Sequence, residues 1–173
     1  MKKNTKAGMR VSHTFEPIYD NRSEILILGT FPSVKSRESA FYYGHPQNRF
    51  WKVLAGLTKE KVPESVREKK ALLLKHGIAI WDVIRSCEIE GSSDSSIREV
   101  EANDIAGLLQ NSSIKRIYGN GDKACRLYDR FCRESAGMEI RRLPSTSPAN
   151  AAFSLDRLMD CWGEIMERNI VAE

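Results

Sequence analysis

Four short segments rich in apolar residues are candidate strands, each closed by a glycine, a proline or a polar turn. The first, Ile25–Leu28, is continuous and ends at Gly29, a pattern typical of a strand buried on both faces. A second buried strand is predicted at Ile78–Ile84, and two further strands, which include charged residues, at Ile114–Gly121 and Met138–Ser145.

Helical patterns separate these strands. A helix is predicted to begin at or near Asn48, and its inner face carries apolar residues at helical spacing: Phe50, Val53, Leu54 and Leu57. Other helices are expected at 66–77, 103–112, 122–137 and 154–166, whereas 30–47 and 87–96 read as loops. Because strands alternate with helices, the sequence predicts one α/β domain over 1–173, a three-layer α/β/α fold around a central, mainly parallel four-stranded sheet. We expect disorder in residues 1–10.

Composition narrows the function classes only slightly. The chain has 27 Lys and Arg against 23 Asp and Glu, a net charge of +4, which permits a polyanionic partner without requiring one. No apolar run approaches the ~20 residues of a membrane span, and no apolar stretch follows the basic N-terminus, so we expect a cytoplasmic protein. The four cysteines include no C-x-x-C pair, which favours buried thiols over a metal or iron–sulfur site.

Polar or aromatic segments lie at or after the ends of the predicted strands: GTFPS, WDVIRSC, GNGDK and PSTSPANAA. Ligands of open α/β sheets bind beyond the carboxyl ends of the strands, so we expect these segments on one rim. Ser145, Thr146 and Ser147 offer hydroxyl and backbone N–H groups just before a predicted helix, which suits a phosphate. The simpler alternative is an ordinary loop whose serines cap that helix.

Five segments occur together in a characteristic order and spacing: GTFPS, YYGHPQNRFW, GIAIWDVIRSC, IYGNGDKA and STSPANAA. On these segments the sequence resembles the uracil-DNA glycosylase superfamily. Within it, the chain is most similar to the hypoxanthine-DNA (deoxyinosine) glycosylase branch, which is related to the mismatch-specific uracil/thymine-DNA glycosylases. The resemblance covers roughly residues 24–167 and implies a four-stranded, mainly parallel sheet between helices.

The resemblance implies that Asn48 of the HPQN segment is the catalytic residue. An amide is no base at neutral pH, but it can accept a hydrogen bond from a water and aim that water at C1′ of the sugar. The alternative is that Asn48 only caps the following helix, and the two roles are compatible. In GTFPS, Phe31 stands where mismatch-specific relatives carry a water-positioning asparagine, which argues against strong uracil activity.

The resemblance also implies a base-binding pocket, formed by Gly29, Phe31, Pro32, Tyr43 and Asp82. Tyr43 matches a phenylalanine that stacks on the flipped base in relatives, and Tyr42 is the alternative platform. Asp82 matches an asparagine that reads the base edge. Its carboxylate could accept a hydrogen bond from a ring N–H of hypoxanthine, and a purely structural role is equally open.

STSPANAA matches the second superfamily motif, but Ser145 replaces the histidine that stabilises the leaving uracil in many members. We expect this segment to press on the DNA strand, with Ala149 and Asn150 at its tip. Asn120 can touch base or phosphate, or serve as a turn residue. The expected DNA contacts are Asn120, Ser145, Thr146, Ser147, Pro148, Ala149 and Asn150.

These observations predict a monofunctional DNA glycosylase of base-excision repair that flips a deaminated base, with hypoxanthine as first substrate and uracil as second. No lysine stands where a Schiff-base nucleophile is expected, so we expect no strand cleavage. We expect no metal or other cofactor, a monomer, no membrane, and double-stranded DNA containing a damaged base as partner. Two alternatives stay open: a catalytically weak or inactive DNA-binding module of the same fold, and a hydrolase of small nucleosides.

Overall fold

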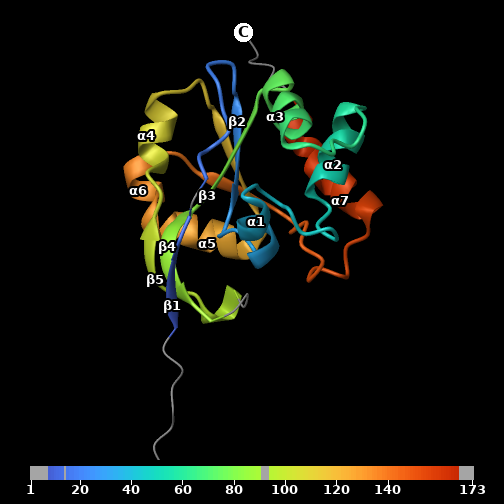
Figure 1. The fold of residues 1–173 in the computed structure, drawn as a ribbon. Helices are drawn as coiled ribbons and strands as arrows, with labels where there is room; N and C mark the ends of the chain where they lie inside the picture. Colours follow the sequence, from blue (N-terminus) through green and yellow to red (C-terminus); the bar gives the residue numbers. More distant parts are fainter. Residues whose placement is uncertain (1–7, 14, 91–93, 168–173) are drawn as a thin grey trace, which may run out of the picture.

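The computed structural model describes residues 8–13, 15–90 and 94–167 (Figure 1). Its central sheet has four parallel strands in the order β3-β2-β6-β7. Their bounds are Ile25–Gly29 (β2), Ile78–Asp82 (β3), Arg116–Asn120 (β6) and Ile140–Leu143 (β7). The predicted four-stranded parallel sheet is therefore confirmed. The strands β3, β6 and β7 are shorter than predicted, whereas β2 extends one residue further, to Gly29.

Both faces of β2 are covered, because every residue of this strand is buried. Ile25 and Ile27 pack in one apolar cluster, whereas Leu26 and Leu28 pack in another on the opposite face, as the alternation of side chains in a strand requires. The first cluster is covered by α2 (Phe50–Thr58), α3 (Val66–Lys75) and α7 (Leu155–Trp162). The second is covered by α4 (Ile105–Gln110), α5 (Asp122–Phe131) and α6 (Arg133–Ala136). The three-layer α/β/α prediction is confirmed.

A second, antiparallel sheet extends the fold and was not predicted. It consists of β1 (Met9–Ser12), β4 (Ile84–Ile89) and β5 (Arg98–Ala102), with β4 in the middle. The prediction of a loop over 87–96 is wrong at its start, where β4 continues almost directly from β3. Residues 91–93 of that loop lie outside the described residues, and 94–96 form a short 3₁₀ helix, η1 (Asp94–Ser96). Polar residues alternate only weakly along β5, so no strand period marks it in the sequence.

The N-terminal expectation is corrected in part. Residues 1–7 lie outside the described residues, but Met9 and Arg10 belong to β1 and pair with Ile89 and Glu88. The strand is not visible as a pattern because it is only four residues long and mostly exposed.

The helices differ from prediction in four places. A short helix, α1 (Val34–Ser39), lies inside the predicted loop 30–47, with the Ser33 hydroxyl accepting a hydrogen bond from the Ser36 N–H. The cap of α4 is Asp104, not Asn103, whose side chain instead donates to the Asp82 carbonyl oxygen at 2.8 Å. The predicted helix 122–137 divides at Cys132 into α5 and α6, and the last helix ends in the 3₁₀ turn η2 (Gly163–Met166).

Cys87 and Cys132 are buried as expected, whereas Cys161 is exposed. Within the described ranges, no helix combines the length and the apolar character that crossing a membrane requires.

The packing of α7 against the sheet can be tested at Trp162, which has no exposed surface. Its ring meets Phe50 edge-on at 5.9 Å, and its Nε1 donates to the Pro144 carbonyl oxygen at 2.9 Å. We expect Trp162→Ala to lower the free energy of unfolding by about 3–5 kcal/mol. Trp162→Phe should cost less because its ring still packs on Phe50. Urea denaturation measures both, and Phe131→Ala, an exposed aromatic on α5, is the control that should stay within about 0.5 kcal/mol of the parent.

Candidate base-binding pocket

The carboxyl ends of the central strands open into one cavity of about 360 Å³. Gly29 ends β2, Asp82 ends β3 and Asn120 ends β6, while Ser145 follows β7 after a single proline. The lining comprises Gly29, Thr30, Phe31, Pro32, Ser33, Val34, Ser36, Arg37, Tyr42, Tyr43, Asn48, Asp82, Ile89, Asn120, Ser145, Thr146, Ser147 and Ala149. Of the residues predicted from the sequence as site residues, all but Pro148 and Asn150 line this cavity.

The floor of the pocket needs a glycine at position 29. A Cβ on Gly29 would lie 2.3 Å from Asp82 Oδ1 and 3.1 Å from the Tyr43 hydroxyl oxygen. The absence of a side chain therefore lets a carboxylate oxygen and a phenol group approach the same point of the β2 backbone. The Tyr43 hydroxyl is buried and makes no hydrogen bond of normal geometry to the described residues, and the Asn120 side chain is the polar group close enough to act on it. Burial, with the nearby charge of Asp82, raises the pKa of this hydroxyl well above its usual value, so Tyr43 stays protonated.

Asp82 is held by a residue that the sequence analysis missed. His13 Nε2 lies 2.8 Å from Asp82 Oδ2, and both side chains are almost fully buried. His13 comes from the end of β1, a strand without a sequence signal, so nothing in the linear pattern connected the two residues. The one hint in the sequence is that His13 lies close to an apolar residue, Phe15, as a partly buried histidine would.

A chain of three polar side chains fixes Asn48. Its Oδ1 accepts hydrogen bonds from the Phe50 N–H at 2.9 Å and from the Thr146 hydroxyl at 2.9 Å. Asn120 Nδ2 in turn donates to the Thr146 hydroxyl oxygen, and Asn120 Oδ1 accepts from the Thr146 N–H, both at 3.0 Å. The N-cap of α2 is Arg49, and Asn48, one residue earlier, satisfies the first N–H of the helix, that of Phe50. Because both lone pairs of Oδ1 are engaged, a water that binds to this oxygen must share it with the Thr146 hydroxyl or replace that hydroxyl. The Nδ2 amide group of Asn48 has no hydrogen-bond partner in the described part of the chain.

The two candidate stacking tyrosines have different surroundings. Tyr42 is 2% exposed and donates its hydroxyl proton to the Glu16 carbonyl oxygen at 2.8 Å, so its ring belongs mainly to the core. Tyr43 is partly exposed, and Phe50 stacks on it at 3.9 Å, so a base could stack only on its other face. Tyr43 also has φ 53°, a left-handed conformation that is strained for a bulky residue and is often found at functional sites.

The wall formed by GTFPS is mostly apolar. Phe31 is 9% exposed and packs against Ile84, Cys87 and Ile89 of the second sheet, while the Arg37 guanidinium lies 5.6 Å from its ring centre. Position 31 thus supplies an apolar surface and no hydrogen-bonding group. The loop that follows is fastened by the buried Ser36, whose hydroxyl oxygen accepts the Gly44 N–H at 2.9 Å. Ser33, Ser36 and Arg37 were not predicted, since α1 was not expected.

The loop after β7 projects its tip outward while its base is fixed. Pro148 and Ala149 are exposed. Behind them, Arg49 donates to the carbonyl oxygens of Ser147 at 2.9 Å, of Asn150 at 3.0 Å, and of Phe153. Asn150 is therefore not at the free tip as expected. Its Nδ2 donates to the Ser145 carbonyl oxygen at 3.0 Å, so this amide closes the loop on itself.

Residues 8–13, 15–90 and 94–167 contain no cluster of three or more His, Cys, Asp or Glu side chains placed to hold a metal ion.

Comparison with known proteins places this geometry in a family. The model of the "Uracil DNA glycosylase superfamily" matches residues 16–165. The chain belongs to that superfamily. Two relatives described as "Hypoxanthine DNA glycosylase" resemble it: one from Methanosarcina acetivorans is 39% identical over 85% of this chain and 93% of the relative, and one from Methanosarcina barkeri is 34% identical over 89% and 97%. A solution NMR structure from Methanosarcina acetivorans, described as that of a proposed uracil DNA glycosylase, superposes with a TM-score of 0.76 at 35% identity, over 88% of this chain and 94% of that one.

We expect the hydrogen bonds of Arg49 to hold the loop 147–153, which overlaps the superfamily's second motif. Arg49→Ala removes the donor that three loop carbonyls share, so the loop 147–153 should open more often. We expect its amides to exchange hydrogen about 10-fold faster or more, measured by mass spectrometry of the corresponding peptide.

Arg157→Ala is the matched control. Arg157 contacts the same loop from outside, through one hydrogen bond to the Ala152 carbonyl oxygen at 3.2 Å and a stack on Phe153. Its substitution should change exchange much less, and equal effects of the two variants would contradict the role given to Arg49.

Proposed function

We propose that this protein is a monofunctional DNA glycosylase that flips hypoxanthine out of double-stranded DNA and hydrolyses its N-glycosidic bond, with uracil as a weaker second substrate. The observation that carries the proposal is the single cavity in which the superfamily's sequence segments meet, with Asn48, Tyr43 and Asp82 on its wall. Support for the base comes from the two relatives described as hypoxanthine DNA glycosylases, both of which match nearly their whole length.

The pocket offers the polar groups that a deaminated base requires. Hypoxanthine carries a ring N–H next to a carbonyl group, so its edge needs an acceptor beside a donor. Asp82 Oδ1 is an acceptor and the protonated Tyr43 hydroxyl is a donor, and both lie next to Gly29. A flipped base that reached this point would satisfy the buried Tyr43 hydroxyl, which otherwise makes no hydrogen bond of normal geometry to the described residues.

The proposed reaction is hydrolysis at C1′ of the sugar. The bond between C1′ and the base nitrogen breaks, the oxygen of a water bonds to C1′, one proton of that water is lost, and the base leaves with a proton from solvent or a nearby group. Asn48 contributes orientation, since an amide does not take up a proton at neutral pH. Its plane is fixed by Thr146 and by the Phe50 N–H before DNA binds, and the water that Oδ1 orients would share this oxygen with the Thr146 hydroxyl or displace it.

Two departures from relatives shape the substrate proposal. Phe31 places an apolar ring where mismatch-specific relatives orient water, and Ser145 offers a hydroxyl where many members use a histidine on the leaving uracil. Both favour a purine substrate over uracil, since neither group is used in the route through Asn48. No lysine is found among the described residues lining the pocket, which supports hydrolysis without a Schiff base and hence without strand cleavage.

DNA would be engaged by the loop after β7. The exposed tip at Pro148 and Ala149 can enter the space that the base leaves. Ser145 and Ser147 line the pocket, and their hydroxyl groups would contact the phosphate backbone of the DNA there. Asn120 is occupied by Thr146 and supports this rim from behind. Cytoplasmic location and a monomeric state stay predictions.

Asn48 can be tested directly on duplex DNA that contains one deoxyinosine. We expect Asn48→Ala to lower the rate of hypoxanthine release by about 100-fold or more, because the oriented amide is lost. The measurement is single-turnover release followed by hot alkali, which cuts the strand only where a base has been removed.

Gln47→Ala is the matched control, since Gln47 is an exposed amide in the same segment. It should release hypoxanthine at the parent rate. Wild-type protein that binds the duplex in a salt-sensitive way but releases no base would support the inactive DNA-binding module instead, and cleavage of free deoxyinosine without DNA binding would support a nucleoside hydrolase.

A further inference from the structure

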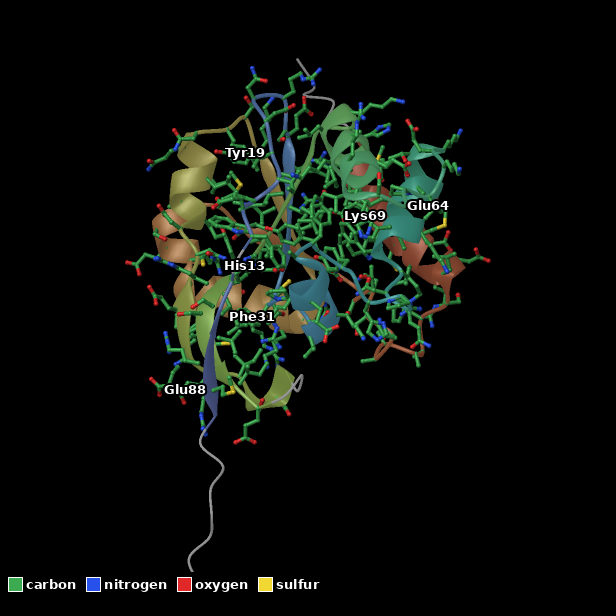
Figure 2. All side chains as sticks on the ribbon, viewed as in Figure 1. His13, Tyr19, Phe31, Glu64, Lys69 and Glu88 are labelled. Carbon is green, nitrogen blue, oxygen red and sulfur yellow. The ribbon has the colours of Figure 1, made fainter. Side chains whose placement is uncertain are left out.

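His13 occupies an enclosed aromatic site behind the pocket. Its backbone N–H donates to the Arg85 carbonyl oxygen at 2.6 Å, which continues the pairing of β1 with β4 by one residue. Its ring lies 4.6 Å from that of Phe15, 5.8 Å from that of Tyr42 and 6.3 Å from that of Phe31. Figure 2 shows His13 and Phe31 near one another beside α1, and only 2% of the His13 side chain is exposed.

From this aromatic site, the His13 side chain forms a hydrogen bond with Asp82. A carboxylate only accepts hydrogen bonds, so the 2.8 Å contact requires a proton on His13 Nε2, donated to Asp82 Oδ2. A buried carboxylate without such a donor is strongly disfavoured, so the histidine stabilises it. Because Oδ2 is engaged, the other oxygen, Oδ1, is the one that lies beside Gly29 in the pocket.

The titratable neighbours of the pair are two tyrosines. Tyr42 and Tyr43 both face Asp82, and burial, with the charge of Asp82, raises the pKa of each hydroxyl well above its usual value. Both remain neutral donors. Asp82 Oδ1 is thus the acceptor at this end of the pocket, next to the Tyr43 hydroxyl, which is a donor. The direction in which Oδ1 points depends on the group that is hydrogen-bonded to Oδ2.

We propose that His13 is a positioning residue for the glycosylase function proposed above: it fixes Asp82 so that Oδ1 accepts a hydrogen bond from the ring N–H of the flipped base. The pair then selects bases that carry a hydrogen at that ring nitrogen, as hypoxanthine does at N1. It rejects adenine, whose N1 carries a lone pair and would face the carboxylate oxygen.

The test compares His13→Phe and His13→Gln in single-turnover release of hypoxanthine from a deoxyinosine duplex. Phenylalanine fits the aromatic site but leaves Oδ2 without a donor, so release should slow by about 10- to 100-fold. Glutamine carries an Nε2 amide that can donate to Oδ2, and should recover most of the lost rate. His76→Gln is the matched control, since it makes the same change in a pair 3.2 Å apart, between His76 at the end of α3 and Glu60 after α2, that does not line the pocket.

A second measurement separates positioning from folding. A duplex with a stable abasic-site analogue has no base to read, so both His13 variants should bind it with wild-type affinity. Release at the wild-type rate by His13→Phe, a Gln variant as slow as the Phe variant, or a matching loss of abasic-duplex binding in both variants would each overturn the inference. A wild-type protein that releases no hypoxanthine would reject the proposed function as well, whereas an active wild type with an unaffected Phe variant would reject the role of His13 alone.

Discussion

Thr146 has no exposed surface, and its backbone and hydroxyl groups bond to two segments that are distant in sequence, residues 48–49 and Asn120. The hydroxyl joins Asn48 to Asn120, the N–H reaches Asn120, and the carbonyl oxygen accepts the Arg49 N–H at 3.1 Å. In a low-dielectric interior, such a satisfied network is stiff, because each group that moves would leave a buried partner unpaired. The rim of the pocket is therefore set by one side chain, and Asn48 takes its orientation from it.

The second sheet has a comparable effect on the opposite wall. Since β4 follows β3 after one residue, its pairing with β1 brings the N-terminal segment back to the end of the central sheet. There His13 reaches Asp82, and Phe31 packs on the inner side of β4. A short antiparallel sheet that adds little to the main core thereby supplies both the carboxylate's partner and an apolar wall.

Much of the fold could be predicted from local pattern. Apolar runs marked β2 and β3, because strands buried on both faces have few polar positions to interrupt the run. The strands β6 and β7 contain arginines and were recognised from shorter apolar segments before Gly121 and Pro144. The second sheet could not be predicted in this way. β1 and β5 are short, largely exposed and charged, so their extended shape comes from pairing with β4 and not from their own composition.

By itself, the sequence determined the three layers, the family and the position of the pocket at the carboxyl ends of the strands. The motif residues lie close to the ends of strands and helices, and the alternation of strands with helices sets the order of those ends. Only the tertiary structure decided which atoms those residues present. The carbonyl oxygen of Asn48 already accepts two hydrogen bonds. The Tyr43 ring stacks on Phe50, and the Asp82 carboxylate is hydrogen-bonded to His13. The reason is physical: hydrogen-bond direction depends on contacts between segments tens of residues apart, and a linear pattern carries no information about them.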